Sequence, residues 1–194
     1  MVEQPDAVID GINILNHFIK AEKAFIGIED NKPDAIKILR EKAKNNPFPI
    51  EVVSLKVKYP QGAEKMLITS VINKEVPSGK LPLDVETMVS NVSSIAALSD
   101  WFRTGKPLIE RVVTVTGTAI KRPANLLVPI GTPMQEVVNY CGGLTQEEVR
   151  MLLGGPMMGM VQRSLNIPVV KGTSGMLMLT GNEVGSIEEY NCVR

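Results

Sequence analysis

The chain has 194 residues, and its 21 lysines and arginines are equal in number to its 21 aspartates and glutamates. This balance argues against electrostatic capture of nucleic acid or of an anionic membrane. The longest apolar runs are far too short to span a bilayer, and the first residues lack the basic and apolar regions of a signal peptide, so we expect a cytosolic setting.

The first half of the chain alternates between helical and strand patterns. Pro33 is a favoured residue in a first helical turn, and a strand on either side of its helix makes a βαβ unit. The predicted elements are helices at 7–20, 33–43, 64–72 and 86–103, with strands at 23–29 and 50–57. This order predicts an α/β fold with parallel strands.

The character of the chain changes near residues 105–110. Strict alternation of strong β-formers predicts strands at 111–118 and 124–130, and Thr132-Pro133 opens a short helix that closes at Cys141. Short β-like pieces follow at 167–171 and 175–180, and the methionines between 151 and 178 are expected to pack in a core. The second half therefore predicts a small α+β module.

The turn after the second strand is the most informative stretch. Tyr59, Pro60 and Gly62 separate that strand from a helix that begins with Glu64 and Lys65. A strand, a glycine turn and a helix N-terminus in this order form ligand sites in open α/β sheets. The alternative is a simple bend, with Glu64 favoured by the helix dipole and Lys65 in solvent. From the residues alone the simple bend is the favoured interpretation.

A second polar cluster lies at residues 89–94, inside an otherwise apolar helical pattern. Serine and asparagine are mildly unfavourable in helix interiors because they compete for backbone hydrogen bonds. Asn91 and its neighbouring serines therefore either face a polar ligand or mark a helix start, with Ser90 or Asn91 as its cap. The pattern alone does not separate these two interpretations.

Other chemistry-bearing residues are few. His17 is the single histidine, which excludes a multi-histidine metal site, and its helical surroundings predict an ordinary helix residue. The two cysteines, Cys141 and Cys192, provide no disulfide framework, and Cys141 is predicted to be a buried helix-end thiol rather than a reactive one. Neither a P-loop nor a glycine-rich dinucleotide motif is present, and self-contained hydrolytic chemistry is not expected.

Several linked motifs resemble the C subunit of the Rnf electron-transport complex, over essentially the whole chain and in order. They are YPQGAEK at 59–65, EVPSG at 75–79, VSNV at 89–92, PLIERVVTVTG at 107–117 and LGGPMMG at 153–159. RnfC-like proteins tied to proline reductase or to cobalamin reduction are close relatives of that family. The chain is more remotely similar to the flavin-binding subunit of respiratory complex I.

The resemblance implies three regions. Residues 1–105 would be the C-terminal part of a Rossmann-like domain that binds FMN and NADH, and residues 106–163 a β-grasp module of the SLBB type. Residues 164–194 would be a linker and short strands that lead to a missing [4Fe–4S] domain. The implied fold class is therefore α/β plus α+β.

The resemblance also implies roles for single residues. Tyr59 would pack near the flavin, Gly62 would allow close approach, and Glu64, with Lys65 beside it, would meet the nicotinamide nucleotide. Asn91 and Ser94 would contact phosphate or ribityl groups of FMN. Cys192 would be the first ligand of a [4Fe–4S] cluster, which needs four thiolates, so the chain alone is expected to hold no cluster and to bind flavin weakly or not at all.

The implied function is electron transfer between NAD(H), FMN and [4Fe–4S] clusters in a membrane-associated Rnf-type complex. The parent protein would lie peripherally at the cytoplasmic face of the plasma membrane and associate with the other subunits. One alternative is an RnfC-like partner of a proline or cobalamin reductase. Another is a docking module without catalysis, whose β-hairpin near 111–130 pairs with a partner.

Overall fold

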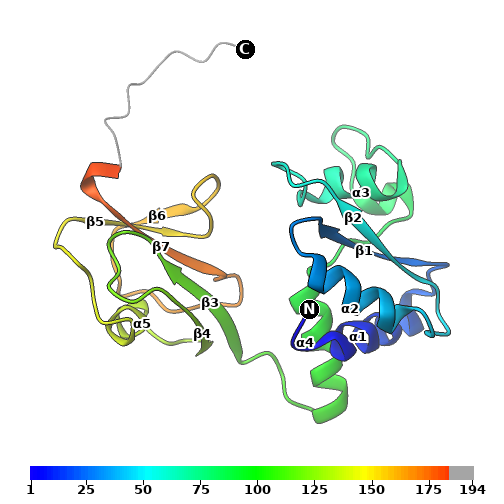
Figure 1. Ribbon diagram of the computed structural model, residues 1–194, viewed down its shortest axis with the longest axis horizontal. Coiled ribbons are helices and arrows are strands. Elements are labelled where there is room, and N and C mark those ends of the chain that lie inside the picture. The colour runs from blue at the N-terminus through cyan, green and yellow to red at the C-terminus, as the bar shows by residue number, and fades with distance from the viewer. Residues whose placement is uncertain (184–194) are drawn as a thin grey trace. The chain divides into compact units, whose positions relative to one another are not determined.

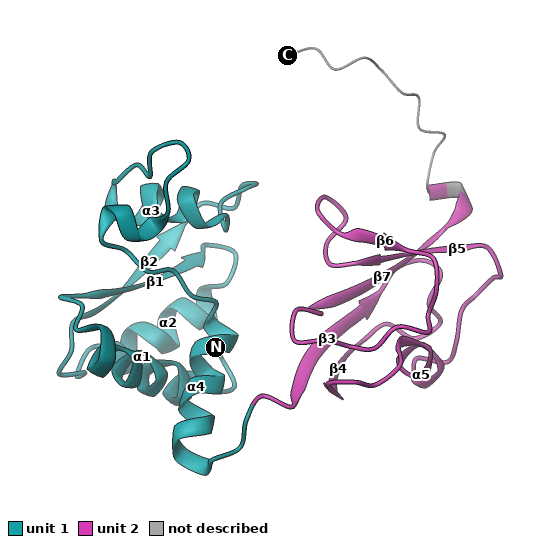
Figure 2. Cartoon of the chain, turned by 180° about the vertical axis from the view of Figure 1, so that it is seen from behind, with its two compact units in different colours: residues 1–107 teal, residues 108–194 magenta. Residues whose placement is uncertain are grey.

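The structure is a computed structural model, and it describes residues 1–183. The chain divides into two compact units, residues 1–107 and residues 108–194 (Figure 2). The first unit alternates helix and strand, and the second is dominated by one sheet, as the sequence patterns predict. Each unit has its own hydrophobic core.

Unit 1 is built around a βαβ unit. The parallel strands β1 and β2 pair in the register Ala24 to Ile50 through Glu29 to Leu55, and α2 connects them. A proline stands in the first turn of both α1 and α2, where its missing N–H costs nothing. The elements are α1 (Pro5–Ile19), β1 (Ala24–Glu29), α2 (Pro33–Ala43), β2 (Ile50–Leu55), α3 (Glu64–Ile72), the 3₁₀ helix η1 (Pro82–Val85) and α4 (Val92–Thr104).

The two faces of the β1–β2 sheet are covered by different helices. Figure 1 shows α1, α2 and α4 on one side of the sheet and α3 on the other. Ile26, Ile28 and Val52 point into the core formed with α1 and α2. Gly27 faces the opposite way, where a Cβ would lie 2.9 Å from side-chain carbons of Leu55 and Leu67. The alternation of side chains along each strand thus separates the two helical layers.

The helix α4 begins later than the sequence pattern predicts. The pattern starts a helix near residue 86, whereas α4 begins at Val92. Glu86 adopts a left-handed conformation after η1, with φ of 55°, and this conformation interrupts the helix. Asn91 then supplies the cap that starts α4.

Unit 2 is a five-stranded mixed sheet with one helix on its face. The strand order is β4-β3-β7-β5-β6, in which β3 and β7 are parallel and the other neighbours antiparallel. Its elements are β3 (Glu110–Thr116), β4 (Ala124–Pro129), α5 (Met134–Tyr140), β5 (Val149–Leu153), β6 (Met160–Gln162), β7 (Gly175–Thr180) and the 3₁₀ helix η2 (Gly181–Glu183).

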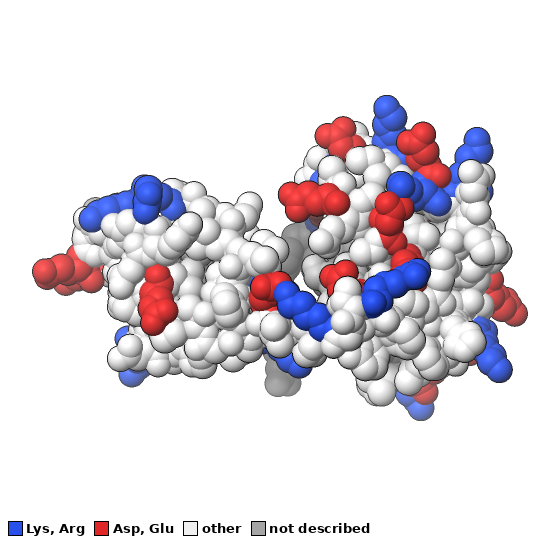
Figure 3. All heavy atoms as spheres, turned by 90° about the horizontal axis from the view of Figure 1, so that it is seen from below, with Lys and Arg blue, Asp and Glu red and all other residues white. Residues whose placement is uncertain are grey.

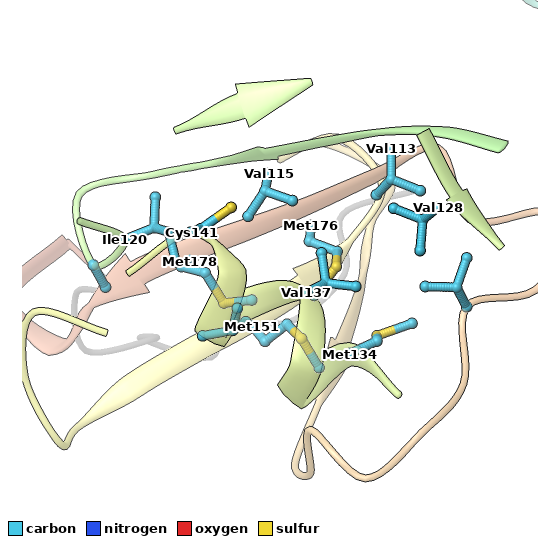
Figure 4. Close-up of a cluster of buried hydrophobic side chains, with 13 residues drawn as sticks. Val113, Val115, Ile120, Val128, Met134, Val137, Cys141, Met151, Met176 and Met178 are labelled. Atoms are coloured by element: carbon cyan, nitrogen blue, oxygen red, sulfur yellow. The ribbon is translucent and has the colours of Figure 1, made fainter. Parts of the chain in front are cut away.

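The core of unit 2 lies between α5 and the sheet, and it is rich in methionine. Figure 4 shows side chains of α5 and of the strands gathered in one buried cluster. Met151, Met176 and Met178 are all at most 4% exposed, which confirms the predicted core packing for these residues, and Met134 is buried beside them. The methionines of the β5–β6 hairpin differ: Met157, Met158 and Met160 are 68%, 81% and 68% exposed, so the core prediction is wrong for them.

Strand β7 belongs to the sheet of unit 2. The family resemblance implies a β-grasp module that ends at residue 163, followed by a linker with short strands at 164–194. In the structure β7 occupies the middle of the sheet, between β3 and β5, and its two core methionines are fully buried. The expected strand at 167–171 is reduced to a single bridge between Pro133 and Pro168.

Candidate functional site

The loop that follows β2 is compact and leaves its predicted site residues in solvent. The carbonyl of Lys58 accepts a 2.8 Å hydrogen bond from the N–H of Gln61, which closes a turn around a cis peptide between Tyr59 and Pro60. The side chain of Tyr59 is 59% exposed. A Cβ placed on Gly62 would meet no atom within 4 Å, so this backbone is open to close approach by a ligand.

The first turn of α3 presents a carboxylate and an ammonium group. Glu64 and Lys65 are both exposed, and within the described part of the chain neither side chain makes an ion pair or hydrogen bond. Ala63 caps α3 without any side-chain hydrogen bond, and its carbonyl accepts the N–H of Leu67 at 2.8 Å. The N–H groups that precede Leu67 in this turn are therefore left for solvent or a ligand.

The second predicted cluster lies at the first turn of α4. The side-chain oxygen of Asn91 accepts a hydrogen bond of 2.9 Å from the N–H of Ser93, which is the geometry of a helix cap. The structure thus confirms that Asn91 starts the helix, and its Nδ2 group remains able to donate. Ser94 is exposed on the same turn, and the first turn of α4 contains no acidic residue.

The two helix starts differ in electrostatic character. Each helix N-terminus carries partial positive charge from its free N–H groups. At α3 the carboxylate of Glu64 opposes an anionic ligand and suits hydroxyl or amide donors. At α4 the N–H groups of Ser93 and Ser94 are already bonded to Asn91. The hydroxyl of Ser94 and the Nδ2 group of Asn91 can still donate, and no carboxylate lies in this first turn, which suits phosphate. Within residues 1–183 no hydrogen bond or ion pair connects the first turn of α3 with the first turn of α4.

A partly buried polar contact holds α4 against α1. Asp10 of α1 accepts hydrogen bonds from Ser99 Oγ at 2.7 Å and from Arg103 Nε at 2.9 Å, and it also pairs with Nη2 of Arg103. The hydrogen bond from Arg103, followed by that from Ser99, lowers the pKa of Asp10 below its ordinary value. Sequence reasoning missed this cluster because its residues lie about ninety positions apart, and no local pattern links them.

The cysteines offer no reactive site among the described residues. Cys141 is 2% exposed at the C-terminal end of α5, and burial raises the pKa of its thiol, which confirms the predicted buried helix-end cysteine. Cys192, the predicted cluster ligand, lies outside the described residues. No group of three or more metal-ligating side chains is found in residues 1–183. His17 is exposed near the end of α1.

Two further surface properties bear on the setting of the chain. None of the helices in the described part of the chain has the length and apolar character needed to cross a bilayer. On the face drawn in Figure 3, basic and acidic side chains are interspersed rather than segregated. That face offers no extended basic surface of the kind that binds a nucleic-acid backbone.

Two protein families match the chain, one to each compact unit. The Nuo51 FMN-binding domain matches residues 1–100, and the SLBB domain matches residues 112–161. The first match covers the βαβ unit together with both helix starts described above. Together the two families confirm the predicted fold class, an α/β flavin-type domain followed by an SLBB module.

Curated relatives match along the whole chain. The chain is 48% identical to the C subunit of the proton-translocating ferredoxin:NAD(+) oxidoreductase complex of Clostridium ljungdahlii, covering 100% of the chain and 42% of the relative. It is 45% identical to the C subunit of the Na(+)-translocating ferredoxin:NAD(+) oxidoreductase complex of Acetobacterium woodii, and this match covers 100% of the chain and 43% of the relative. It is 42% identical to the C subunit of the ion-translocating oxidoreductase complex of Rhodobacter capsulatus, and this match covers 100% of the chain and 37% of the relative.

The chain thus spans about two fifths of the length of these relatives. Sequence motifs, family matches and relatives agree, and each covers the chain from the βαβ unit into the five-stranded sheet. The chain belongs to the Nuo51 FMN-binding domain family and carries an SLBB domain, and it is similar over its whole length to the C subunits of ion-translocating oxidoreductase complexes.

Proposed function

We propose that this chain is part of the C subunit of an ion-translocating ferredoxin:NAD(+) oxidoreductase complex, where it helps to bind FMN and NAD(H). The observation that carries the proposal is the 48% identity to such a protein across the full chain. The relatives named above are all C subunits of ion-translocating complexes, which favours this assignment over a partner of a proline or cobalamin reductase.

The two helix starts divide the ligand groups between them. Phosphate and ribityl oxygens of FMN would meet the amide of Asn91, the hydroxyl of Ser94 and the positive end of the α4 dipole. The carboxylate of Glu64 would accept hydrogen bonds from hydroxyl or amide groups of the nicotinamide nucleotide, and Lys65 would neutralise its phosphates. The exposed ring of Tyr59 supplies a flat apolar surface, and the open space at Gly62 lets the ligand reach the backbone.

These residues position the ligands, while the bound flavin supplies the exchange between hydride and single electrons. A [4Fe–4S] cluster would exchange electrons with the flavin in the parent protein, with Cys192 as its proposed first ligand. The parent protein would lie at the cytoplasmic face of the membrane with the other subunits of the complex, and the interspersed charge in Figure 3 suits contact with proteins rather than nucleic acid.

A chimeric protein tests the proposal. The segment of the Clostridium ljungdahlii relative that aligns with this chain is replaced by this chain, and the product is purified anaerobically. We expect it to retain bound FMN and to oxidise NADH with an artificial electron acceptor. A chimera that folds and assembles, yet holds no flavin when FMN is supplied, contradicts the proposal.

Single substitutions in the chimera separate the roles of the two helix starts. Asn91→Asp keeps a good helix cap but places a negative charge beside the proposed phosphate, so we expect bound FMN to fall about tenfold or more. Glu64→Gln is expected to raise the KM for NADH about tenfold and to leave bound FMN unchanged. Lys37→Gln, at an exposed position on α2, is the matched control and changes neither property.

A second candidate function is docking of another protein of the complex by unit 2. The observation that favours it is the β5–β6 hairpin, where Met157, Met158 and Met160 are each at least 68% exposed. Exposed methionines form adaptable apolar contact surfaces. The hairpin backbone is held in place, because Gly159 donates a 2.7 Å hydrogen bond to the carbonyl of Gly155.

Paired glutamine substitutions test this docking role. Met157→Gln together with Met158→Gln in the chimera is expected to prevent assembly of the complex, measured by co-purification of the other subunits, while bound FMN is retained. Met88→Gln, at a 54% exposed position in unit 1, serves as the control. Normal assembly of the doubly substituted protein argues against docking through this hairpin.

A further inference from the structure

The outer edge of β2 has no neighbouring strand among the described residues. The carbonyls of Pro49 and Leu55 accept hydrogen bonds from Ala24 and Asp30, so odd-numbered residues of β2 direct their backbone groups toward β1. The backbone groups of Ile50, Val52 and Ser54 therefore point away from β1. The sheet order contains only β1 and β2, so no other strand of residues 1–183 pairs with this edge.

Among residues 1–183, one side chain is hydrogen-bonded to this edge, and its contact is loose. Arg40, which lies near the end of α2, places both Nε and Nη2 at 3.4 Å from the carbonyl oxygen of Val52. This distance lies beyond the usual range of 2.7–3.2 Å for N–H···O hydrogen bonds, so the contact is weak and easily replaced. Arg40 is itself exposed, and a ligand that approaches the edge meets its guanidinium group first.

A groove runs beside the same edge, between β2 and the end of α2. It has a volume of about 530 Å³ and includes the side chains of Lys23, Arg40 and Lys44 in its lining. The single carboxylate in the lining, Glu51, is already paired with Lys23. Lys44 has no carboxylate partner within the described part of the chain. The groove is therefore net positive, and its floor carries free backbone donors and acceptors.

We propose that the free edge of β2 is a docking site for an extended, acidic segment of a partner protein, which adds to the sheet as a further strand. Main-chain hydrogen bonds to Ile50, Val52 and Ser54 would supply affinity, as in other cases of strand addition. Side chains of an added strand alternate between the two faces of a sheet. Carboxylates at every second position would thus lie on the face of α2, beside Arg40 and Lys44.

The occupant follows from the chemistry of the groove. A neutral strand would leave Arg40 and Lys44 without carboxylate partners, and a basic strand would be repelled by them. A free anion would satisfy the charges but leave the outward backbone groups of β2 unpaired. An extended acidic segment pairs with the cationic side chains and also with the outward backbone groups of β2. This site lies apart from the proposed ligand residues at α3 and α4, so the inference goes beyond the proposed function.

Binding of a synthetic peptide tests the proposal with the chain of 194 residues. The probe is a fluorescent peptide of alternating glutamate and threonine, and the comparison peptide has glutamine in place of glutamate. We expect the acidic peptide to bind at least about tenfold more tightly at low salt, with affinity that falls as salt is raised. Equal binding of the two peptides, or no binding of either, overturns the proposal.

Two matched substitutions ask whether the strand edge itself is used. Ser54→Pro removes an outward N–H without touching the bonds to β1, whereas Ser54→Ala keeps that N–H. We expect Ser54→Pro to weaken peptide binding about tenfold and Ser54→Ala to leave it unchanged. Equal affinity of the two variants overturns the strand-addition geometry. Circular dichroism tests whether Ser54→Pro is folded. If it is unfolded, the charge variant Lys44→Glu replaces it, and we expect that variant to weaken peptide binding about tenfold.

Amide hydrogen exchange locates the bound peptide and distinguishes it from a simple anion. We expect the acidic peptide to slow exchange at Val52 and Ser54 and to leave Val53, which already faces β1, unchanged. Inorganic phosphate is expected to produce no such protection. Equal protection of these amides by phosphate alone, or protection elsewhere in the chain but not at β2, overturns the proposal.

Discussion

Ser99 Oγ donates a 2.7 Å hydrogen bond to the carboxylate of Asp10, and this contact joins α4 to α1 across 89 positions of the chain. Ser99 is only 4% exposed, so its hydroxyl depends on Asp10 for a partner. The helix α4 also carries Asn91 at its first turn, where the proposed FMN contacts lie. The contact between Ser99 and Asp10 thus helps to fix the position of the candidate site.

Lowering the pH should weaken unit 1 through Asp10. Hydrogen bonds from Arg103 and Ser99 hold the pKa of Asp10 below 3.8, so the folded protein binds this proton less readily than the unfolded chain. The stability that Asp10 contributes is therefore complete above pH 3.8 and is lost as the pH falls through the lower, folded pKa. The contribution of Asp10 to the free energy of unfolding is measured by urea unfolding of the wild type and of Asp10→Asn at several pH values. Fluorescence of the single tryptophan, Trp101, reports the unfolding.

We expect the wild type to be more stable than Asp10→Asn at neutral pH, with a difference that narrows as the pH falls below 3.8. A difference that stays constant down to low pH, or widens there, contradicts the assignment. Ser99→Ala is a companion variant that removes one hydrogen bond without changing charge. It should cost about 1 kcal/mol at neutral pH.

Gly11→Ala should disrupt the contact between α1 and α4. A Cβ at this position would lie 2.0 Å from the carbonyl oxygen of Ile95, and because this atom belongs to backbone, α4 would have to move. We expect a loss of about 3 kcal/mol in the free energy of unfolding. Gly27→Ala is the control, since its Cβ would meet only side-chain carbons at 2.9 Å, which can shift at a lower cost. Equal losses for both variants contradict this explanation.

Gly62→Ala should separate ligand binding from stability. Nothing lies within 4 Å of a Cβ at Gly62, so we expect the melting temperature to stay within the error of the measurement. In the chimera described above, the added methyl group should raise the KM for NADH, because it occupies the space through which the ligand approaches the backbone. An unchanged KM would remove Gly62 from the proposed site.

Cys141 should react with alkylating reagents only after unfolding. Its thiol is 2% exposed and its pKa is raised by burial, so little thiolate is available at neutral pH. In a Cys192→Ser variant, mass spectrometry after iodoacetamide treatment is expected to show no modification in buffer and complete modification in denaturant. Rapid modification in buffer would show that the end of α5 opens readily.

Removal of residues 164–194 should unfold unit 2 and leave unit 1 folded. The deletion takes away β7, whose buried Met176 and Met178 complete the core and whose backbone pairs with β3 and β5. Fluorescence of Trp101 should then be unchanged, while the native dispersion of NMR signals from β3 and β4 is lost. A shortened chain in which β3 and β4 stay folded contradicts the central role of β7.

Local patterns predict most of unit 1 because its elements are encoded locally. The proline at the start of α2 and the strand patterns around it are enough to define the βαβ unit. The place of β7 is different, since its pairing with β3 joins residues 114–116 to residues 175–177, and no local pattern records such a pairing. The order of strands in a mixed sheet depends on contacts that only the folded chain brings together.

In the candidate site, too, local sequence patterns identify some features, whereas others depend on contacts between distant residues. The sequence pattern identifies the turn at Tyr59 to Lys65 and leaves Asn91 between two interpretations. The structure shows that Asn91 is a helix cap, because its side chain accepts a hydrogen bond from the N–H of Ser93 at the start of α4. The support that Asp10 and Arg103 give to α4 is beyond sequence reasoning, since the two residues are 93 positions apart. The roles of Glu64, Asn91 and the other site residues toward ligands stay predictions.

The parallel pairing of β3 with β7 has a consequence during synthesis of the protein. Gly175 pairs with Thr114, so translation must add 61 residues (175 minus 114) before this neighbour exists. At ordinary translation speeds this takes on the order of 3–12 s. Once β4 has been added, the hairpin of β3 and β4 presents one open strand edge to solvent, with Val113 and Val115 not yet enclosed. The nascent second unit therefore exposes an apolar strand edge until β7 has been synthesised.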